Sequence, residues 1–157
     1  MHSYERYRGA LTRKAERVLR SAEDARDIVQ ELFADLLSNP PNTDSPTLDL
    51  PYLYRAVTNR CLTLLRDERN RARLLSLSEP DDFVASRRPD PSDLMSRRAL
   101  LHLCGELDAE ATQVLIYYFI DELSQEEIAN LVGLSRKTVG VRLESIRAAA
   151  LELRGTP

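Results

Sequence analysis

Apolar residues recur every three or four positions over much of the chain, which is the spacing of one face of an α-helix. The first run covers about residues 4–37 and breaks near Ser21, where a capping residue precedes two acids. The segment 38–51 contains prolines and cannot continue the helix, so we expect a loop there. A third amphipathic run covers about residues 52–73. The pattern therefore predicts three helices in the first half of the chain.

The second half shows the same spacing after an interruption. Residues 77–93 hold three prolines and several acids and lack periodicity, so we expect a flexible linker. Helical spacing resumes over residues 94–107 and 109–120. The chain is therefore expected to be all-α, with two small helical domains at residues 1–76 and 94–157 joined by the linker.

The segment Ser124–Ala148 reads as a helix, a tight turn and a second helix. Ser124 and Glu127 have the spacing of a capping box, and Gly133 suits the left-handed residue just past a helix end. Ser135 is placed to cap the second helix. This arrangement is typical of a helix-turn-helix that lays its second helix along DNA. An ordinary antiparallel helix pair is the alternative for this segment taken alone.

The charge of the chain limits how it can bind DNA. It has 22 Lys and Arg against 25 Asp and Glu in 157 residues, a formal net charge of −3. Because DNA affinity comes mainly from counterion release by Lys and Arg, such a chain needs a local basic patch or a larger partner. The predicted helix at 52–73 holds six arginines and is the most basic. Tyrosines among these arginines suit single-stranded nucleic acid, although a solvated charged face is the simpler interpretation.

Few residues of the chain suggest catalysis, metal binding or disulfide formation. Cys61 and Cys104 each lie among apolar residues and are expected to be buried thiols. His2 and His102 have no neighbouring set of metal ligands, and no nucleophile–base pattern appears. We therefore expect no enzyme activity, no metal and no cofactor. No signal peptide or membrane span is visible, so we expect a cytoplasmic protein.

Four segments together carry a family resemblance. They read DARDIVQELF (24–33), PYLYRAVTNRCLTLLR (51–66), LDAEATQVLIYYFIDELS (107–124) and EIANLVGLSRKTVGVRL (127–143). In this order and spacing the chain resembles bacterial RNA polymerase sigma factors of the extracytoplasmic-function group. The resemblance covers nearly the whole chain except the linker. It implies a region 2 helical bundle, a region 4 helix-turn-helix, and a role in promoter recognition and transcription initiation.

The resemblance also implies three sets of contact residues. The core polymerase is expected to bind one polar face of the second helix, at Asp24, Asp27, Gln30 and Glu31. The minus-ten promoter element is expected to contact the basic helix, at Tyr52, Tyr54, Arg55, Asn59, Thr63 and Arg66. The minus-thirty-five element is expected to contact the last helix, at Ser135, Arg136, Lys137, Thr138, Val141, Arg142 and Arg147.

The partners implied are core RNA polymerase, through its beta-prime clamp and beta flap, and promoter DNA. Many members of the family are also held by an anti-sigma factor, and no membrane partner is expected.

Two other functions stay open at this point. A helix-turn-helix regulator that binds operators unaided would explain Ser124–Ala148 but neither DARDIVQELF nor the arginine-rich helix. A sigma-like protein-interaction module would suit the C-terminal domain, which from Gly105 onward has 5 basic residues against 9 acids.

Overall fold

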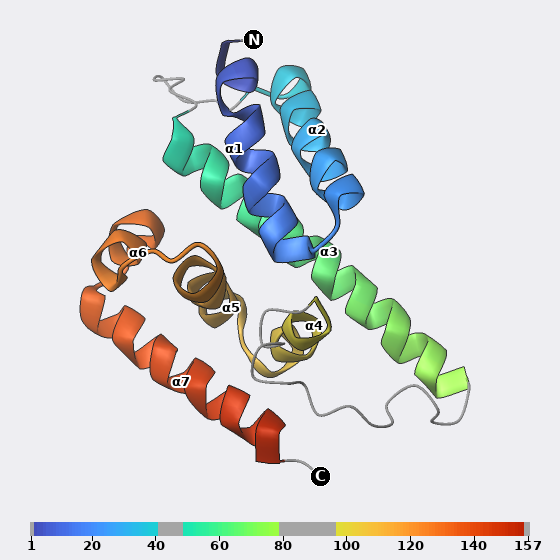
Figure 1. Ribbon diagram of the computed structural model, residues 1–157, viewed down its shortest axis with the longest axis vertical. Coiled ribbons are helices and arrows are strands. Elements are labelled where there is room, and N and C mark those ends of the chain that lie inside the picture. Colours follow the sequence, from blue (N-terminus) through green and yellow to red (C-terminus); the bar gives the residue numbers. More distant parts are fainter. Residues whose placement is uncertain (1, 41–48, 79–96, 156–157) are drawn as a thin grey trace. The chain divides into compact units, whose positions relative to one another are not determined.

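The computed structural model describes residues 2–40, 49–78 and 97–155, and within these ranges the chain is helical with no strand (Figure 1). This confirms the predicted all-α fold. Contacts divide the chain into two compact units, Met1–Cys61 and Leu62–Pro157. The boundary between these units falls inside a long helix, whereas the domain boundary expected from the sequence follows residue 76 and stays a prediction. The expected linker lies outside the described residues, except for its first two positions, which are helical.

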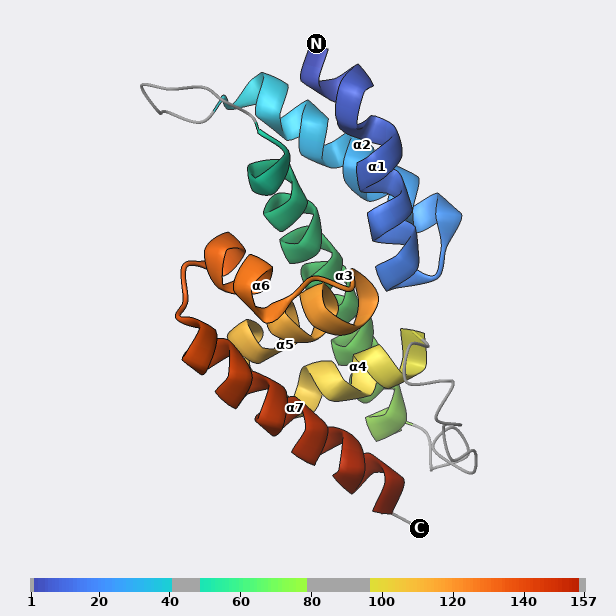
Figure 2. The ribbon, with the colours of Figure 1, turned by 60° about the vertical axis from the view of Figure 1, so that its left-hand side comes forward.

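The first unit is built on a pair of packed helices, α1 (His2–Leu19) and α2 (Ala22–Ser38), which lie side by side (Figures 1 and 2). Ser21 begins α2 as predicted, because its hydroxyl accepts a hydrogen bond from the backbone N–H of Asp24 at 3.2 Å. The apolar stripes of both helices are buried, with Leu11, Ala15, Val18 and Leu19 from α1 and Ala25, Ile28, Val29, Leu32 and Phe33 from α2.

Helix α3 (Leu50–Ser78) is longer at both ends than the sequence pattern predicted. Asp49 begins it, since its carboxylate accepts the Tyr52 N–H at 3.0 Å. Pro51 therefore lies in the first turn, where its missing N–H would have no helical partner in any case. At the other end, no glycine or proline occurs between residues 52 and 79, so nothing in the sequence forces the helix to stop earlier.

The second unit contains the later part of α3 and the C-terminal helices, seen in Figure 2: α4 (Arg97–Glu106), α5 (Ala109–Leu115), η2 (Ile116–Ile120), α6 (Gln125–Val132) and α7 (Arg136–Gly155). The helix expected over residues 109–120 is α-helical for its first part only. Its last turn is a π-helix, in which Asp121 donates its N–H to the Ile116 carbonyl at 3.0 Å. Arg97 joins α4 to α3 through two hydrogen bonds to one Glu68 oxygen, at 2.6 and 2.9 Å.

The predicted helix-turn-helix is confirmed in its details. Ser124 and Glu127 form a reciprocal capping box, with N–H to side-chain distances of 3.1 and 3.3 Å. Gly133 ends α6 in the left-handed region, at φ 73°. Ser135 then accepts the Thr138 N–H at 3.1 Å and begins α7. Val139, Leu143 and Ile146 of α7 are buried, as their spacing predicted.

Cys61 and Cys104 are both buried, as expected. Among the described residues, no helix has the length and apolar character needed to cross a membrane.

Candidate nucleic-acid and protein interfaces

One side of α2 presents the residues that the sequence assigned to a protein partner. Asp27, Gln30 and Glu31 are exposed and Asp24 is partly exposed. The buried stripe of α2 faces the other way, into the packing with α1. The four side chains therefore share one outward surface of a rigid helix, which we call the acidic face. Whether a polymerase binds it stays a prediction.

One side of α3 is polar and accessible. Arg55, Asn59 and Thr63 are exposed, while Tyr52 and Arg66 are partly exposed. Their spacing of three or four residues places all five on one line along the helix, which we call the polar face of α3. Arg60 lies beside this line and pairs with Asp35 of α2 at 2.5 Å. Arg60 therefore joins the two helices, while the polar face remains directed outward.

Tyr54 does not share that face. The Nζ of Lys14 lies 3.9 Å from the centre of the Tyr54 ring, and Lys14 itself is fully buried. One turn further along α3, the buried Thr58 hydroxyl donates to the Tyr54 carbonyl at 3.0 Å. One face of the Tyr54 ring is therefore covered by α1, which leaves Tyr52 as the better placed of the two tyrosines for base stacking.

Lys14 is a residue that the sequence analysis missed. A signal was present, because Lys14 stands between Leu11, Ala15 and Val18, on the side of α1 whose other residues are apolar. A lysine at such a position must either extend to the surface or find a partner in the interior. The structure shows the second outcome, with an aromatic ring as one neighbour.

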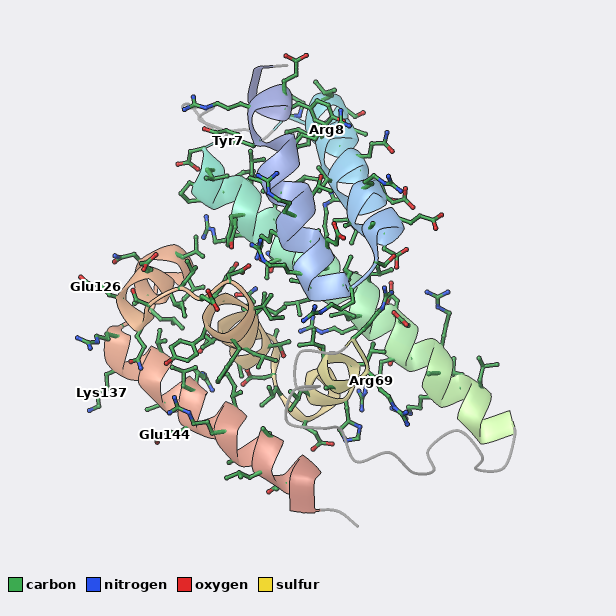
Figure 3. The ribbon with its side chains drawn as sticks, viewed as in Figure 1. Tyr7, Arg8, Arg69, Glu126, Lys137 and Glu144 are labelled. Atoms are coloured by element: carbon green, nitrogen blue, oxygen red, sulfur yellow. The ribbon has the colours of Figure 1, made fainter. Side chains whose placement is uncertain are left out.

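Between residues 136 and 147, the outward side of α7 carries three exposed basic residues and one exposed acid. Arg136, Lys137 and Arg147 are exposed, Thr138 is partly exposed, and Val141 has 52% of its surface accessible. Figure 3 shows Lys137 and Glu144 both directed away from the other helices of this unit. An acid therefore accompanies the basic residues on the surface expected to meet DNA, which limits the electrostatic attraction of this helix.

Arg142 is half-buried and pairs with two carboxylates at the start of α5. Its Nε donates to Glu110 Oε1 at 2.7 Å and its Nη1 to Asp108 Oδ2 at 3.4 Å. Asp108 also caps α5 by accepting the Ala111 N–H at 2.8 Å. The hydrogen bond and the charge of Glu110 raise the pKa of the Arg142 guanidinium. The structure thus directs this arginine from α7 toward the start of α5.

The chain matches two regions of one protein family in succession. Residues 3–71 match Sigma-70 region 2, and residues 97–149 match Sigma-70, region 4. The matches include α1, α2 and most of α3 in the first case, and α4 to most of α7 in the second.

Three proteins of similar sequence are described as RNA polymerase sigma factors, one of them as a probable one. The chain is 27% identical to a probable RNA polymerase sigma factor, RfaY of Xanthomonas campestris, over 83% of this chain and 34% of the relative. It is 27% identical to the sigma factor SigV of Bacillus subtilis, over 80% of this chain and 72% of the relative. It is 28% identical to the sigma factor CarQ of Myxococcus xanthus, over 76% and 68%. The chain thus spans about a third of RfaY and about 70% of the other two.

A solved structure has a similar fold. The sigma factor RpoE of Bartonella quintana, crystallised in complex with the anti-sigma factor NepR, superposes with a TM-score of 0.51. The match covers 97% of this chain and 94% of that one at 19% sequence identity, so it supports the fold alone.

Proposed function

Because the chain belongs to the sigma-70 family, with the regions 2 and 4 of its extracytoplasmic-function group, we propose that it binds core RNA polymerase and directs transcription from specific promoters. The observation that carries the proposal is the presence of both regions, in the family order, in one chain. The family consists of initiation factors, so the chain is not an enzyme. A stand-alone operator-binding regulator is less well supported, because it leaves the region 2 match unexplained.

The acidic face of α2 is the proposed site for the polymerase clamp. Asp27 and Glu31 are exposed carboxylates and Gln30 is an exposed amide, so together they can accept hydrogen bonds from basic residues. Charged contacts of this kind set the orientation and association rate of a complex more than its final affinity. The packing of α2 against α1 keeps these side chains on a fixed surface.

The polar face of α3 is the proposed site for the minus-ten element. Tyr52 offers a ring for stacking on an unpaired base, and Arg55 and Arg66 offer guanidinium groups for phosphates. Asn59 lies between them with an amide that can pair with a base edge. Holding an extruded base would offset part of the cost of opening the duplex, which is a few kcal/mol per step.

The first turns of α7 are the proposed site for the minus-thirty-five element. Recognition helices contact base edges through their N-terminal residues. In α7 the residues at this end are Ser135, Arg136, Lys137, Thr138 and Val141. Arg147 lies further along and is placed for a phosphate. The few positive charges predict a weak contact that depends on the polymerase for most of its affinity.

Each of the two domains would have its own part in promoter recognition. Residues 1–76 would act as the polymerase and minus-ten domain, residues 94–157 as the minus-thirty-five domain, and the protein would work in the cytoplasm. The beta flap is the proposed polymerase partner of the second domain. An anti-sigma factor is a proposed regulator, by analogy with the Bartonella sigma factor, which was crystallised with one.

The proposal is tested by binding the purified protein to core RNA polymerase and transcribing a pool of promoter fragments. Tight binding with a selective set of transcripts is the expected result. Failure of the folded protein to bind the core would contradict the proposal and leave an unaided DNA-binding protein or an interaction module.

A further inference from the structure

Arg142 lies between two surfaces of α7. On one side is the buried stripe of Val139, Leu143 and Ile146, and on the other is the outward surface that carries Lys137 and Val141. The Arg142 side chain is 34% exposed, and both of its observed partners come from residues at the start of α5. Its two hydrogen bonds therefore connect α7 to an element that lies more than 30 residues earlier in the chain.

We propose that Arg142 is a positioning residue, which braces α7 against the N-terminus of α5 and does not read DNA. This inference rests on the proposed contact between α7 and the minus-thirty-five element. The brace fixes the rotation of α7 about its own axis, and that rotation decides whether Lys137 and Val141 meet the base edges. Asp108 and Glu110 are the carboxylates that accept the hydrogen bonds of Arg142 and hold it in place.

The charges around Arg142 support this role. Two carboxylates lie within 3.4 Å of its guanidinium, so the local charge of the group of three is negative. A DNA phosphate approaching Arg142 would be repelled by Asp108 and Glu110 while it was attracted by the arginine. The carboxylates are themselves favoured where they are, because they lie at the positive end of the α5 dipole and Asp108 caps that helix.

The hydrogen bonds of Arg142 use two of the five N–H donors of its guanidinium, one of them on the Nε edge. Arginine reads guanine through two parallel donors on one edge of its guanidinium. In Arg142 the Nε is already directed at Glu110 at 2.7 Å and Nη1 is directed at Asp108. Turning the Nε edge of the guanidinium toward a base on the outward surface of α7 would break its hydrogen bond to Glu110.

Glu110 distinguishes the brace from direct readout, because the two roles predict opposite effects of its removal. The measurement is the ratio of holoenzyme affinities for a promoter with the minus-thirty-five element and the same promoter with that element scrambled. If Arg142 is a brace, Glu110→Gln lowers the ratio about as much as Arg142→Gln, by roughly five- to tenfold. If Arg142 reads DNA, Glu110→Gln releases the arginine and leaves the ratio unchanged or higher, which would overturn the proposal.

Salt dependence supplies a second readout. Arg142→Gln is expected to lower affinity without changing the slope of log affinity against log salt concentration. Arg136→Ala is expected to reduce that slope by about one, because one phosphate contact, and with it the release of about one counterion, is lost. A slope reduced equally by both variants would contradict the brace. The exchange Arg142→Glu with Glu110→Arg should restore the ratio to within about twofold of wild type, and failure to restore it would count against the brace.

Matched controls separate this inference from the proposed function. Glu106→Gln removes the same charge from an exposed site elsewhere in the second unit and is expected to leave the ratio unchanged. If the wild-type protein does not bind the core polymerase, the proposed function fails before the brace is tested. If the wild-type holoenzyme binds but Lys137→Ala has no effect on the ratio, the assignment of α7 fails and the brace fails with it.

Discussion

The ammonium group of Lys14 lies 3.9 Å from the centre of the Tyr54 ring, in a part of the first unit where Lys14 has no solvent-exposed surface. A buried cation is costly unless its surroundings compensate for the lost water. An aromatic face provides part of that compensation, worth about 2 kcal/mol or more when the pair is desolvated. The contact ties α1 to the start of α3, next to the proposed minus-ten residues Tyr52 and Arg55.

We therefore expect Tyr54→Leu to destabilise the protein by about 2 kcal/mol, since it removes the ring and leaves the lysine buried. Tyr54→Phe keeps the ring face and should cost less than about 1 kcal/mol. Denaturant unfolding of the two variants measures the difference. Equal losses would mean that the hydroxyl, not the ring, matters to Lys14.

Removing the polar groups of the acidic face should weaken polymerase binding. For Asp27→Ala combined with Gln30→Ala we expect about tenfold weaker binding to the core, equal to about 1.4 kcal/mol. Both side chains are exposed, so the unfolding midpoint should not change. Fluorescence anisotropy of the labelled protein titrated with core polymerase measures the affinity.

Glu5→Ala is the matched control, because it removes an exposed acid from α1 of the same unit. An equal loss of affinity in this variant would mean that general negative charge matters, and not a defined surface.

Changes on the polar face of α3 should act after polymerase binding. We expect Asn59→Ala combined with Arg66→Ala to leave core affinity unchanged and to reduce open-complex formation by at least about tenfold, because it removes a proposed base contact and a proposed phosphate contact. Permanganate reactivity of unpaired thymines reports the opening. Arg71→Ala removes an exposed arginine from another side of the same helix and is expected to have little effect. Normal opening by the double variant would move the DNA contact to another surface.

Cys104 should be unreactive in the folded protein. Burial raises the pKa of its thiol above the ordinary value of 9.0, although the nearby charges of Arg66 and Arg69 act in the opposite direction. The thiolate is the reactive form, so alkylation at pH 7 is expected to be at least about tenfold slower than in the unfolded chain. Mass spectrometry after a timed iodoacetamide pulse measures the alkylation rate of Cys104 separately from that of Cys61.

The same shift predicts how stability depends on pH. Because the folded pKa of Cys104 is raised, the unfolded thiol ionises first, so the free energy of unfolding falls as pH rises past about 9. Below that value the contribution is fully present. Cys104→Ala should flatten this part of the pH profile, and an unchanged profile would assign the decline to other groups.

Features that depend on neighbours in sequence were predictable. The capping box of Ser124 and Glu127 and the left-handed Gly133 involve residues within a few positions of one another, so local hydrogen bonding is enough to specify them. The buried stripes of α2 and α7 follow from helical spacing for the same reason. The helix-turn-helix, the all-α class and the outward faces of the helices could therefore be predicted from the sequence alone.

The roles of single charged residues depended instead on how the helices pack. Lys14 and Tyr54 are 40 positions apart, and Arg142 and Glu110 are 32 apart. No local rule pairs residues at such distances, because each pairing depends on how two helices are rotated and packed against one another. Sequence reasoning therefore placed Tyr54 and Arg142 among the residues that contact DNA. The packed structure places a lysine on one and two carboxylates on the other.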